Sequence, residues 1–546
     1  MKKHITRLLF AALLLLALCI GASAAGTSGK CGPSAYWSFD SSTGTLTISG
    51  SGAMNDCVFQ WGDPDPRPWS AYLSEIKTVV IGDSITKIGK ESFSSLSCTT
   101  VRIGKNVQVI GENAFMNCTS LTGDLVIPDS VTTIDRWAFF GSVISNGTLT
   151  LGKGLRTIGK RAFTGCSFSG GLTIPEGVTE IAEGAFCSSS KYSSSPALGK
   201  ITGTLTLPST LKTIGAYAFA YEGFSGELLI PDGVTSIGAN AFAECDGFGG
   251  TLSLPDSVKT VGESAFYLCE GFTGLKLSAG LTKIERYSFA HMYGLKTKVV
   301  IPEGVTEIGE SAFSCSDMPS VRFPSTLKKI GKQAFQFAGL TKITLPNGLE
   351  TIGDEAFDCW NVNKAIVIPA SVKSIGKNAF RRYSYYGSGT LGAYFLGDAP
   401  QLVGTLNANC SFPSDWTLFY LPGTSGWTGD TYEGYKIVPW DGETRWDNLR
   451  TSKFGYGWDN KGNEIETSWS VNTDTGKITL TDDLNEGCAV AVSYDADGRV
   501  TSIGVLRTKT DFVVLNLQDT CRLFLLNASS APRLNTPVTI NDYLPT

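Results

Sequence analysis

The sequence predicts a mainly β solenoid made of about 13 coils, and three observations predict it. A dipeptide Ala-Phe or Ser-Phe recurs thirteen times, and a short alternation of apolar residues precedes each copy. Eleven of the twelve steps from one of its phenylalanines to the next are about 22–24 residues long. Self-similarity at a fixed period of this length is typical of repeat proteins, whose coils bury their apolar edges only by stacking on one another.

Residues 1-24 are predicted to be a signal peptide. Two lysines and one arginine precede an apolar run over residues 8–20, and Ala22 and Ala24 frame a small-x-small cleavage site. The run is short for a membrane span, and no second run of about 18 apolar residues follows it. Cys19 offers an alternative lipidation site, but Leu18 stands where a small residue is required, so cleavage after Ala24 is favoured. The sequence therefore predicts a secreted or extracellular cell-surface protein, with no transmembrane segment in the mature chain.

The charge balance argues against two classes of partner. Cleavage of the signal removes three of the 45 Lys+Arg residues, which leaves 42 against 50 Asp+Glu, a net charge of −8. The charges are interspersed and form no basic block. We therefore expect no binding to nucleic acid or to an anionic membrane surface.

Residues 25-76 precede the first repeat and are predicted to form an amino-terminal cap. A bare coil end would expose unpaired strand edges and apolar columns, so it needs a cover. Cys31 and Cys57 fall in this segment and are the candidate disulfide pair. The aromatic side chains predicted to cover the first coil are Trp37, Trp61, Trp69 and Tyr72.

Residues 77-380 are predicted to form the solenoid. In one unit Leu228 and Ile230 alternate with an outward residue, which is the period of a strand, and Val234 and Ile237 lead into a second short extended stretch or turn. Proline follows the first strand in nine coils, where it costs no ladder hydrogen bond. The segment around Ala-Phe is predicted to be a helical or 3₁₀ turn.

Glycine follows the second Ile or Val in ten of the thirteen coils, and Asp, Ala and Glu replace it in the other three. A position that needs a positive φ would make Ala and Glu costly. We therefore predict an ordinary negative φ at this place, where small size helps but is not required.

The phenylalanines of the repeated dipeptide are predicted to stack into one column, in which each buried ring contributes about 1.5–3 kcal/mol. The residue before each of them is Ala or Ser, which indicates closely approaching backbones. The one long step, from Phe186 to Phe219, contains a polar stretch at 188–196 that is predicted to be a surface loop. The thirteen residues are Phe93, Phe115, Phe139, Phe163, Phe186, Phe219, Phe242, Phe266, Phe289, Phe313, Phe335, Phe357 and Phe380.

Thirteen cysteines remain after cleavage of the signal, an odd number that cannot all pair internally. Cys118, Cys166, Cys245 and Cys269 each lie three residues after a repeat phenylalanine, so stacking would bring them into one column. No Cys-x-x-Cys occurs and histidine partners are missing, which argues against a metal. We expect small buried thiols that pack like Ala or Val, with incidental disulfides as the alternative.

Catalytic chemistry finds little support in the sequence. His291 is the one histidine outside the signal, and it lies in a repeat turn, so a Ser or Cys nucleophile lacks a positioned base. Acidic residues mostly occupy recurring turns, as Glu176 and Glu303 do, which indicates a turn preference and not a catalytic pair. Asp495 and Asp497 resemble part of a calcium loop, but its bidentate Glu is missing. We therefore predict no enzyme activity, no cofactor and no metal.

The outward residue in the middle of each first strand gives the candidate binding face. This column is mostly Thr and aliphatic, with three positive charges and no negative one. Thr and Val suit a strand surface for structural reasons alone, so a plain β-propensity ladder is the alternative to a broad protein-binding face. The column consists of Val80, Arg102, Val126, Thr150, Thr173, Thr206, Leu229, Ser253, Lys276, Val300, Arg322, Thr344 and Val367.

Residues 381-442 are predicted to cap the far end of the solenoid, and residues 443-546 are predicted to form a β-sandwich module. In the module, residues 489–494 and 500–505 alternate around a turn-forming stretch and predict a hairpin, and 512–517 and 522–526 add further strands. The aromatic residues predicted to cover the last coil are Tyr394, Phe395, Trp416, Phe419, Tyr420 and Trp427.

The repeat, written L-x-I-P-x-x-V-x-x-I-G-x-x-A-F-x-x-C, resembles the BspA-like leucine-rich repeats of bacterial surface proteins. The resemblance runs from about Lys77 to Phe380, and both flanks share it, with Cys31-Gly32 and Pro68-Trp69 before the repeats and the segment 416–440 after them. It implies a curved leucine-rich-repeat solenoid and adhesion-type roles at the cell surface, such as binding host matrix proteins or other cells.

We therefore expect an extracellular scaffold that binds a protein or glycan ligand. Two alternatives stay open: a structural component of the cell envelope without a discrete ligand, and a glycan-binding surface protein. The ligand, the mode of wall attachment or release and the oligomeric state do not follow from the sequence.

Overall fold

A computed structural model shows the chain as two compact units, residues 1–418 with 426–436, and residues 419–425 with 437–546. The structure describes residues 27–439 apart from 61, 146, 189–199, 342, 359–365, 382–391, 404–410 and 415, and beyond them only strands between 455 and 539. The predicted signal peptide, Trp61 and the insertion at 189–196 therefore lie outside the described residues. The domain boundaries expected from the sequence stay a prediction.

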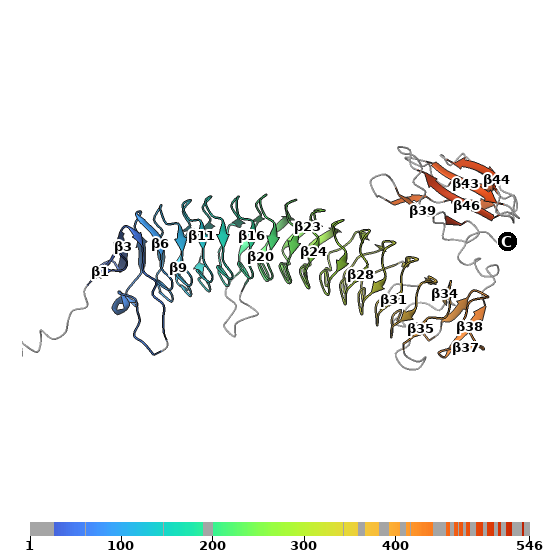
Figure 1. Ribbon diagram of the computed structural model, residues 1–546, viewed down its shortest axis with the longest axis horizontal. Coiled ribbons are helices and arrows are strands. Elements are labelled where there is room, and N and C mark those ends of the chain that lie inside the picture. The colour runs from blue at the N-terminus through green and yellow to red at the C-terminus, as the bar shows by residue number, and fades with distance from the viewer. Residues whose placement is uncertain are drawn as a thin grey trace, which may run out of the picture. The chain divides into compact units, whose positions relative to one another are not determined.

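Each repeat forms one coil of a mainly β stack, and the coils follow one another in a single row (Figure 1). The first strands of successive coils form the first-strand column, in which equivalent residues pair in parallel, for example Val126 with Thr150 and Thr173 with Thr206. The first-strand column consists of β5 (Thr78–Ile81), β7 (Thr100–Arg102), β10 (Leu125–Val126), β13 (Leu149–Thr150), β15 (Leu172–Thr173), β18 (Leu205–Thr206), β21 (Gly226–Leu229), β23 (Phe248–Ser253), β25 (Phe272–Lys276), β27 (Val299–Val300), β29 (Val321–Arg322) and β32 (Ile366–Ile368).

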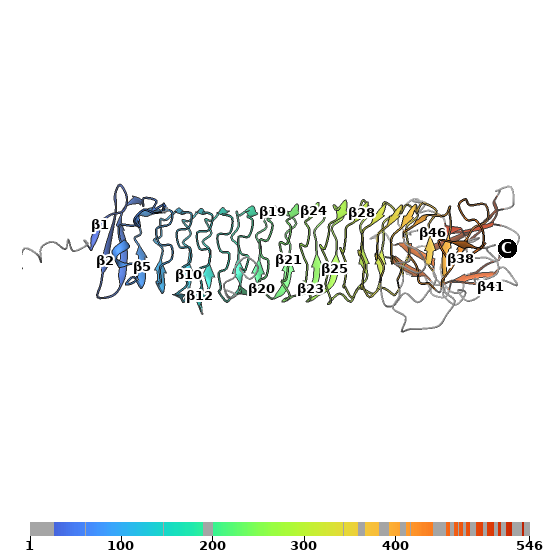
Figure 2. The same ribbon diagram turned by 90° about the horizontal axis from the view of Figure 1, so that it is seen from below.

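The second extended stretch of each coil is also a strand. These second strands form a more continuous column than the first strands do, because they pair in sheets of five, four and six strands. Figure 2 shows β19, β24 and β28 of this column along one edge of the row and β21, β23 and β25 along another. The second-strand column consists of β6 (Ile85–Ile88), β8 (Val109–Ile110), β11 (Thr133–Ile134), β14 (Thr157–Ile158), β16 (Glu180–Ile181), β19 (Thr213–Ile214), β22 (Ser236–Ile237), β24 (Thr260–Val261), β26 (Lys283–Ile284), β28 (Glu307–Ile308), β30 (Lys329–Ile330), β31 (Thr351–Ile352), β33 (Ser374–Ile375) and β35 (Gln401–Leu402).

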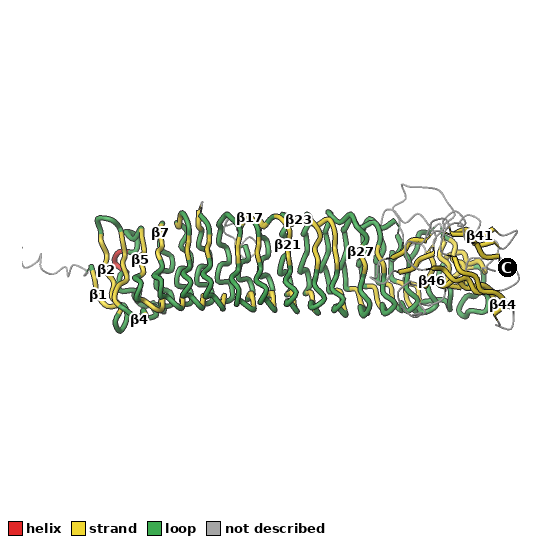
Figure 3. Tube along the Cα trace, turned by 90° about the horizontal axis from the view of Figure 1, so that it is seen from above, coloured by secondary structure: helices red, strands yellow, loops and turns green. Residues whose placement is uncertain are grey.

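A third short strand follows the Ala-Phe turn in some coils. These strands are β9 (Leu121–Thr122), β12 (Ile144–Ser145), β17 (Thr202–Gly203) and β20 (Gly223–Phe224), and they pair in parallel with their counterparts. Loops and turns make up most of each coil, as the green segments of Figure 3 show.

The predicted phenylalanine column is confirmed. All thirteen rings are stacked, with centroids 5.1 to 5.7 Å apart and planes within 18° of each other. The centroids of Phe186 and Phe219 are 5.6 Å apart although the insertion lies between these residues in sequence. The long insertion therefore leaves the stack without disturbing its register.

The turn around Ala-Phe is not helical, so this part of the prediction was wrong. The residue two positions before the phenylalanine has a left-handed backbone in every coil, with φ between 51° and 61°, and it is glycine only at Gly184. Such residues interrupt a helix and turn the N–H groups toward the next coil. Asn113, Phe115 and Asn117 donate in this way to backbone carbonyl oxygens of the following coil, at 3.2, 2.7 and 2.7 Å.

A left-handed conformation costs a non-glycine residue about 1–2 kcal/mol. In the coils from Glu91 to Phe337 the turn satisfies three backbone N–H groups through bonds to the next coil. An unpaired buried N–H would cost a comparable amount. The stacked hydrogen bonds therefore keep the strained residue in place.

The glycine after the second strand behaves as predicted. None of the ten glycines at this place has a positive φ. A Cβ added at Gly238 would lie 2.5 Å from the backbone nitrogen of Ala216 in the preceding coil. Small size thus relieves a close approach of two backbones, and Asp135, Ala182 and Glu285 occupy this place in the other three coils.

The column of cysteines is buried as expected, but its members do more than fill space. The thiols of Cys166, Cys245 and Cys269 donate to the carbonyl oxygen of the phenylalanine in the preceding coil, at 3.0 to 3.1 Å. Ser316 makes the same bond at 2.9 Å with its hydroxyl. Position three after the phenylalanine is therefore a place for a short donor.

We expect Cys245→Ser to retain most of the stability and Cys245→Ala to lose about 1–2 kcal/mol, because alanine leaves the Phe219 carbonyl oxygen buried without its donor. Urea unfolding followed by circular dichroism measures both changes. Equal losses in the two variants would show that the thiol only fills volume.

Aromatic caps cover both ends of the phenylalanine column. Trp69 stacks on Phe93 at 5.4 Å at one end, and Phe412 stacks on Phe380 at 5.2 Å and on Trp416 at 5.8 Å at the other. Trp69 and Trp416 were predicted to cover the ends, whereas the role of Phe412 was missed. Both indole N–H groups are buried without a hydrogen-bond partner among the described residues, so covering the apolar column outweighs pairing them.

The amino-terminal cap consists of β1 (Ser28–Lys30), β2 (Ala35–Asp40), β3 (Thr45–Gly50), β4 (Gly52–Ala53) and the 3₁₀ helix η1 (Ser70–Tyr72). β1, β2 and β3 pair antiparallel, and β3 then pairs in parallel with β5, so the cap sheet continues into the first-strand column. After the last repeat come β34 (Gly392–Phe395), β36 (Thr417–Tyr420), β37 (Thr431–Tyr432) and β38 (Tyr435–Pro439).

The strands beyond residue 454 pair antiparallel in three sheets of two, three and four strands. β43 pairs with β44, from Ala489 with Leu506 to Tyr494 with Val500, which confirms the predicted pairing of these two stretches. The turn between them, with Asp495 and Asp497, lies outside the described residues, and the sandwich arrangement stays a prediction. The strands are β39 (Gly455–Trp458), β40 (Glu464–Thr467), β41 (Trp469–Asn472), β42 (Lys477–Leu480), β43 (Cys488–Tyr494), β44 (Val500–Leu506), β45 (Phe512–Val514), β46 (Thr520–Leu526) and β47 (Val538–Thr539).

Candidate binding face

The structure places the whole predicted column on the outside of the solenoid. Most of its residues alternate with buried neighbours, as Leu228 and Ile230 flank Leu229, so the pleat of the strand turns the column to solvent. Val80 and Arg322 are half-buried and the other eleven are exposed. Thr344 lies outside the strands that the structure describes, but it is exposed like the rest.

Parallel register aligns this column within each sheet of the first-strand column. Leu229 pairs with Ser253, which pairs with Lys276, and Val300 pairs with Arg322. Equivalent side chains of adjacent coils therefore lie side by side at the spacing of strands, about 4.8 Å. We call this column the strand face.

The strand face holds an unusual share of exposed apolar groups. Eight large apolar side chains are exposed among the described residues, and four of them, Val126, Leu229, Val300 and Val367, belong to this one column. Leu229 is 67% exposed and Val126 is 54% exposed. A β-propensity ladder would place Thr or Val here, but a leucine two-thirds exposed has no such structural reason.

The cap extends the same surface. Tyr36 is 44% exposed on β2, and it alternates with the buried Ala35 and Trp37. Because β2, β3, β5 and β7 form one sheet, Tyr36 faces the same side as Arg102. Sequence reasoning missed Tyr36, although the alternation of the segment 35–40 was available to find it.

Charge on the strand face is sparse and positive. Arg102 and Lys276 are exposed, whereas Arg322 is half-buried. Burial lowers the pKa of Arg322, and the Glu303 carboxylate partly offsets this by raising it. Such a face would tolerate apolar and acidic contacts better than basic ones.

The structure places the other singled-out residues away from this face. His291 is half-buried in a turn, where it contacts Tyr293, and burial lowers its pKa below the ordinary value. Within the described ranges, no group of three or more His, Cys, Asp or Glu side chains could hold a metal ion. In the same part of the chain, no helix combines the length and apolar character of a membrane span.

Cys31 and Cys57 are buried free thiols in the amino-terminal cap. Burial raises the pKa of Cys31 to about 12, and the neighbouring Cys57 adds a smaller effect in the same direction. Their disulfide stays a prediction, and the high pKa means that oxidation would act on a poorly ionised thiol.

Comparisons with known proteins agree with this architecture. A family model described as BspA type leucine-rich repeat region matches residues 86–198, 200–314 and 294–388 in six copies. Among curated proteins, none matches the sequence.

Several solved structures are similar to this chain. A leucine-rich repeat protein from Bacteroides ovatus ATCC 8483 is 20% identical over 66% of this chain and 93% of its own, with a TM-score of 0.41. One from Eubacterium ventriosum ATCC 27560 is 20% identical over 66% and 98%, with a TM-score of 0.34. A leucine-rich cell surface protein from Faecalibacterium prausnitzii A2-165 is 25% identical over 56% and 92%, with a TM-score of 0.30.

Proposed function

Because the chain belongs to the BspA-type leucine-rich-repeat family, we propose that it is exported and works at the cell surface, or in the medium, as a scaffold that binds extracellular proteins. The observation that carries the proposal is the strand face, which holds four exposed large apolar side chains, with Leu229 at 67% and Val126 at 54% exposure. Exposed apolar groups aligned along a rigid stack lose little conformational entropy when a partner covers them.

The scaffold needs no catalytic group. A solenoid offers breadth because every coil adds one more row of side chains to the same surface. Neighbouring rows such as Thr206, Leu229 and Ser253 combine hydroxyl groups with an apolar centre, which is the composition of an interface core with a polar rim.

The test replaces Thr173, Thr206 and Leu229 with glutamate in one variant. These residues are exposed, so the fold should persist, whereas three carboxylates in an apolar contact should weaken partner binding about tenfold or more. Binding of wild type and variant to a panel of extracellular-matrix proteins and bacterial wall glycans is measured by surface plasmon resonance. Circular dichroism and the melting temperature check the fold.

A matched control carries glutamate at Thr179, Lys212 and Thr235, which are exposed in the same three coils but precede the second strand. It adds more negative charge than the first variant, so a loss confined to the strand-face variant cannot come from net charge. Equal binding by all three proteins, or binding to glycans alone, would remove the strand face as a protein-binding surface.

A further inference from the structure

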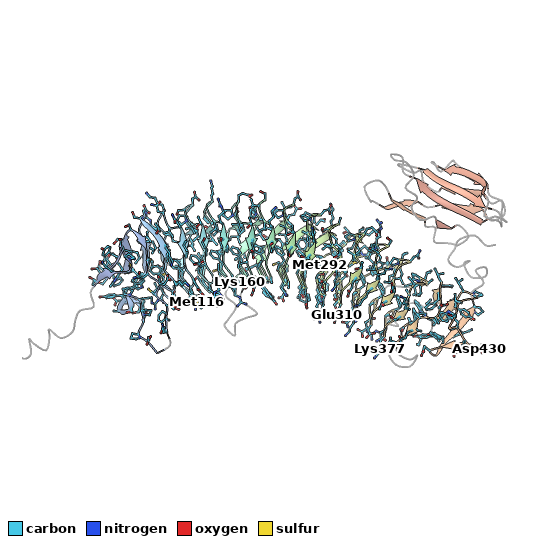
Figure 4. All side chains as sticks on the ribbon, in the orientation of Figure 1. Met116, Lys160, Met292, Glu310, Lys377 and Asp430 are labelled. Carbon is cyan, nitrogen blue, oxygen red and sulfur yellow. The ribbon has the colours of Figure 1, made fainter. Side chains whose placement is uncertain are left out.

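Four aromatic side chains gather on the edge formed by the Ala-Phe turns, away from the strand face. The ring centroids of Tyr267 and Tyr287 lie 6.2 Å apart, those of Tyr267 and His291 5.2 Å and those of His291 and Tyr293 5.6 Å, with planes 72° to 80° apart. Tyr293 is 43% exposed and the other three are half-buried. We call these residues the aromatic patch. In Figure 4, the labelled Met292 lies in the coil of Tyr287, His291 and Tyr293, and the labelled Glu310 lies in the coil that follows it.

Three acidic residues lie on the same edge in the coils of the aromatic patch and the coil before it: Glu244, Asp246 and Glu270. Asp246, Glu270 and Tyr293 each lie four residues after a repeat phenylalanine in successive coils, and the backbone N–H of Glu244 donates to the Tyr267 carbonyl oxygen at 2.7 Å. Burial lowers the pKa of His291 and raises that of Tyr293, and Glu270 is close enough to push both pKa values upward. None of the three carboxylates forms an ion pair within the part of the chain that the structure describes.

On the same edge, at Tyr287 of the patch and at Trp137, the chain itself shows what such a combination accepts. Arg286 lies 4.6 Å from the centre of the Tyr287 ring and pairs with carboxylates of both neighbouring coils, Glu263 at 3.3 Å and Glu310 at 3.4 Å. Arg136 lies 4.2 Å from the centre of the Trp137 ring and pairs with Glu112. In both places a guanidinium is stacked on an aromatic ring and held by a carboxylate from another coil.

We propose that the aromatic patch, with Glu244, Asp246 and Glu270, binds arginine side chains of an extracellular protein partner. Arg286 of this chain already covers Tyr287. The rest of the patch, Tyr267, His291 and Tyr293, offers rings, beside acidic residues, on which no arginine of the described residues is stacked. Guanidinium groups stack on aromatic faces and pair with carboxylates more effectively than ammonium groups do. Tyrosine-rich surface clusters also carry much of the energy of protein interfaces.

Two cations of the same coil, Lys296 and Arg286, are engaged by other carboxylates. Lys296 pairs with Asp317 at 2.8 Å and donates to the Tyr293 carbonyl oxygen at 3.3 Å, and Arg286 is held by its two glutamates. Burial lowers the pKa of His291, which disfavours the charged form of this ring, although Glu270 raises the pKa in part. The field at the patch is therefore set by the three unpaired carboxylates.

The test measures binding of the mature chain to a fluorescent peptide of four Arg-Gly repeats, compared with a matched Lys-Gly peptide, at low ionic strength. We expect the Arg peptide to bind more tightly than the Lys peptide, because only guanidinium groups stack well on the rings. Tyr267→Leu with Tyr293→Leu should weaken the Arg peptide about fivefold and leave the Lys peptide nearly unchanged. Glu244→Gln, Asp246→Asn and Glu270→Gln together should weaken both peptides.

The matched control neutralises Glu180, Glu227 and Asp232, three exposed carboxylates that form no ion pair among the described residues. It makes the same change in net charge and should bind the Arg peptide as the wild type does. Equal loss in the control, or equal affinity for the two peptides in all proteins, would overturn the proposal. The strand-face variant should keep its affinity for the Arg peptide, so the two proposals can fail separately.

Discussion

Replacing Phe163 with alanine is expected to lower the free energy of unfolding by about 3–5 kcal/mol. The ring is fully buried and lies between Phe139 and Phe186, with centroids 5.1 and 5.2 Å away and planes within 3°. Its removal loses the transfer free energy of the ring and leaves a cavity that the ladder of backbone hydrogen bonds keeps open. Urea unfolding followed by far-ultraviolet circular dichroism measures the change.

Phe140 provides the control for this prediction. It adjoins Phe139 in sequence, but it is half-buried and lies outside the phenylalanine column. Phe140→Ala should therefore cost clearly less than Phe163→Ala. A similar cost for both variants would show that the column has no special share in holding the coils together.

Replacing Glu222 with glutamine is expected to stabilise the protein at high pH and to leave it unchanged at low pH. Glu222 is fully buried at the position where other coils carry a Cys or Ser donor. Its Oε2 accepts the backbone N–H of Ile201 at 2.5 Å, and its Oε1 has no partner among the described residues. Burial raises the pKa of Glu222 well above the usual value, although the Ile201 hydrogen bond and Lys200 lower it in part.

The direction of this pH-dependent stability difference follows from proton linkage. A carboxyl whose pKa is raised by folding binds its proton more tightly in the folded state. Its contribution to the free energy of unfolding is therefore fully present below the ordinary carboxyl pKa. That contribution is lost as the pH rises through the pKa of the folded state. Glutamine keeps an acceptor for Ile201 and has no proton to lose. The melting temperatures of the two proteins should coincide at about pH 4 and differ by several degrees at about pH 8. Parallel curves across this range would show that Glu222 does not titrate with folding.

The other ionisable groups near Glu222 are the thiols of Cys166, Cys187 and Cys245, whose pKa values burial also raises. They stay protonated over the range of this experiment. The difference between the two proteins therefore reports on the carboxyl alone.

Periodicity predicted the parts of the fold that depend on similar side chains at equivalent positions of successive coils. The phenylalanine column, the alternation around Leu229 and the covering of the ends by Trp69 and Trp416 all follow from apolar residues at fixed intervals. In each case the physical cause, burial of an apolar edge by the next coil, acts on residue type directly.

Backbone geometry was not predictable in the same way. The left-handed position two residues before the phenylalanine carries Glu91, Trp137 and Tyr287 among others, so no residue type marks it. The expected helical turn around Ala-Phe followed from local spacing alone. Hydrogen bonds to the next coil, which local sequence does not show, decide the conformation instead.

The roles of residues that break the repeat were missed, because they depend on contacts between coils that local sequence does not show. Glu222 stands where Cys245 and Cys269 stand in later coils, and this mismatch was visible in the sequence. The aromatic patch arises because Tyr267 and Tyr287 occupy different positions of adjacent coils, so no single column reveals it. Only the stacking register brings such residues together.

The strand face, the phenylalanine column and the aromatic patch all require that equivalent residues of neighbouring coils lie side by side. Oxidation of paired cysteine variants on the strand face tests this most directly. Thr173 pairs in register with Thr206 across the long insertion, and the spacing of adjacent strands, about 4.8 Å, lies within the Cα separation that a disulfide spans. The double variant Thr173→Cys with Thr206→Cys should form a disulfide on mild oxidation, identified by peptide mass, whereas Thr173→Cys with Leu229→Cys should not. Efficient coupling of the second pair, or none in the first, would contradict the in-register stack.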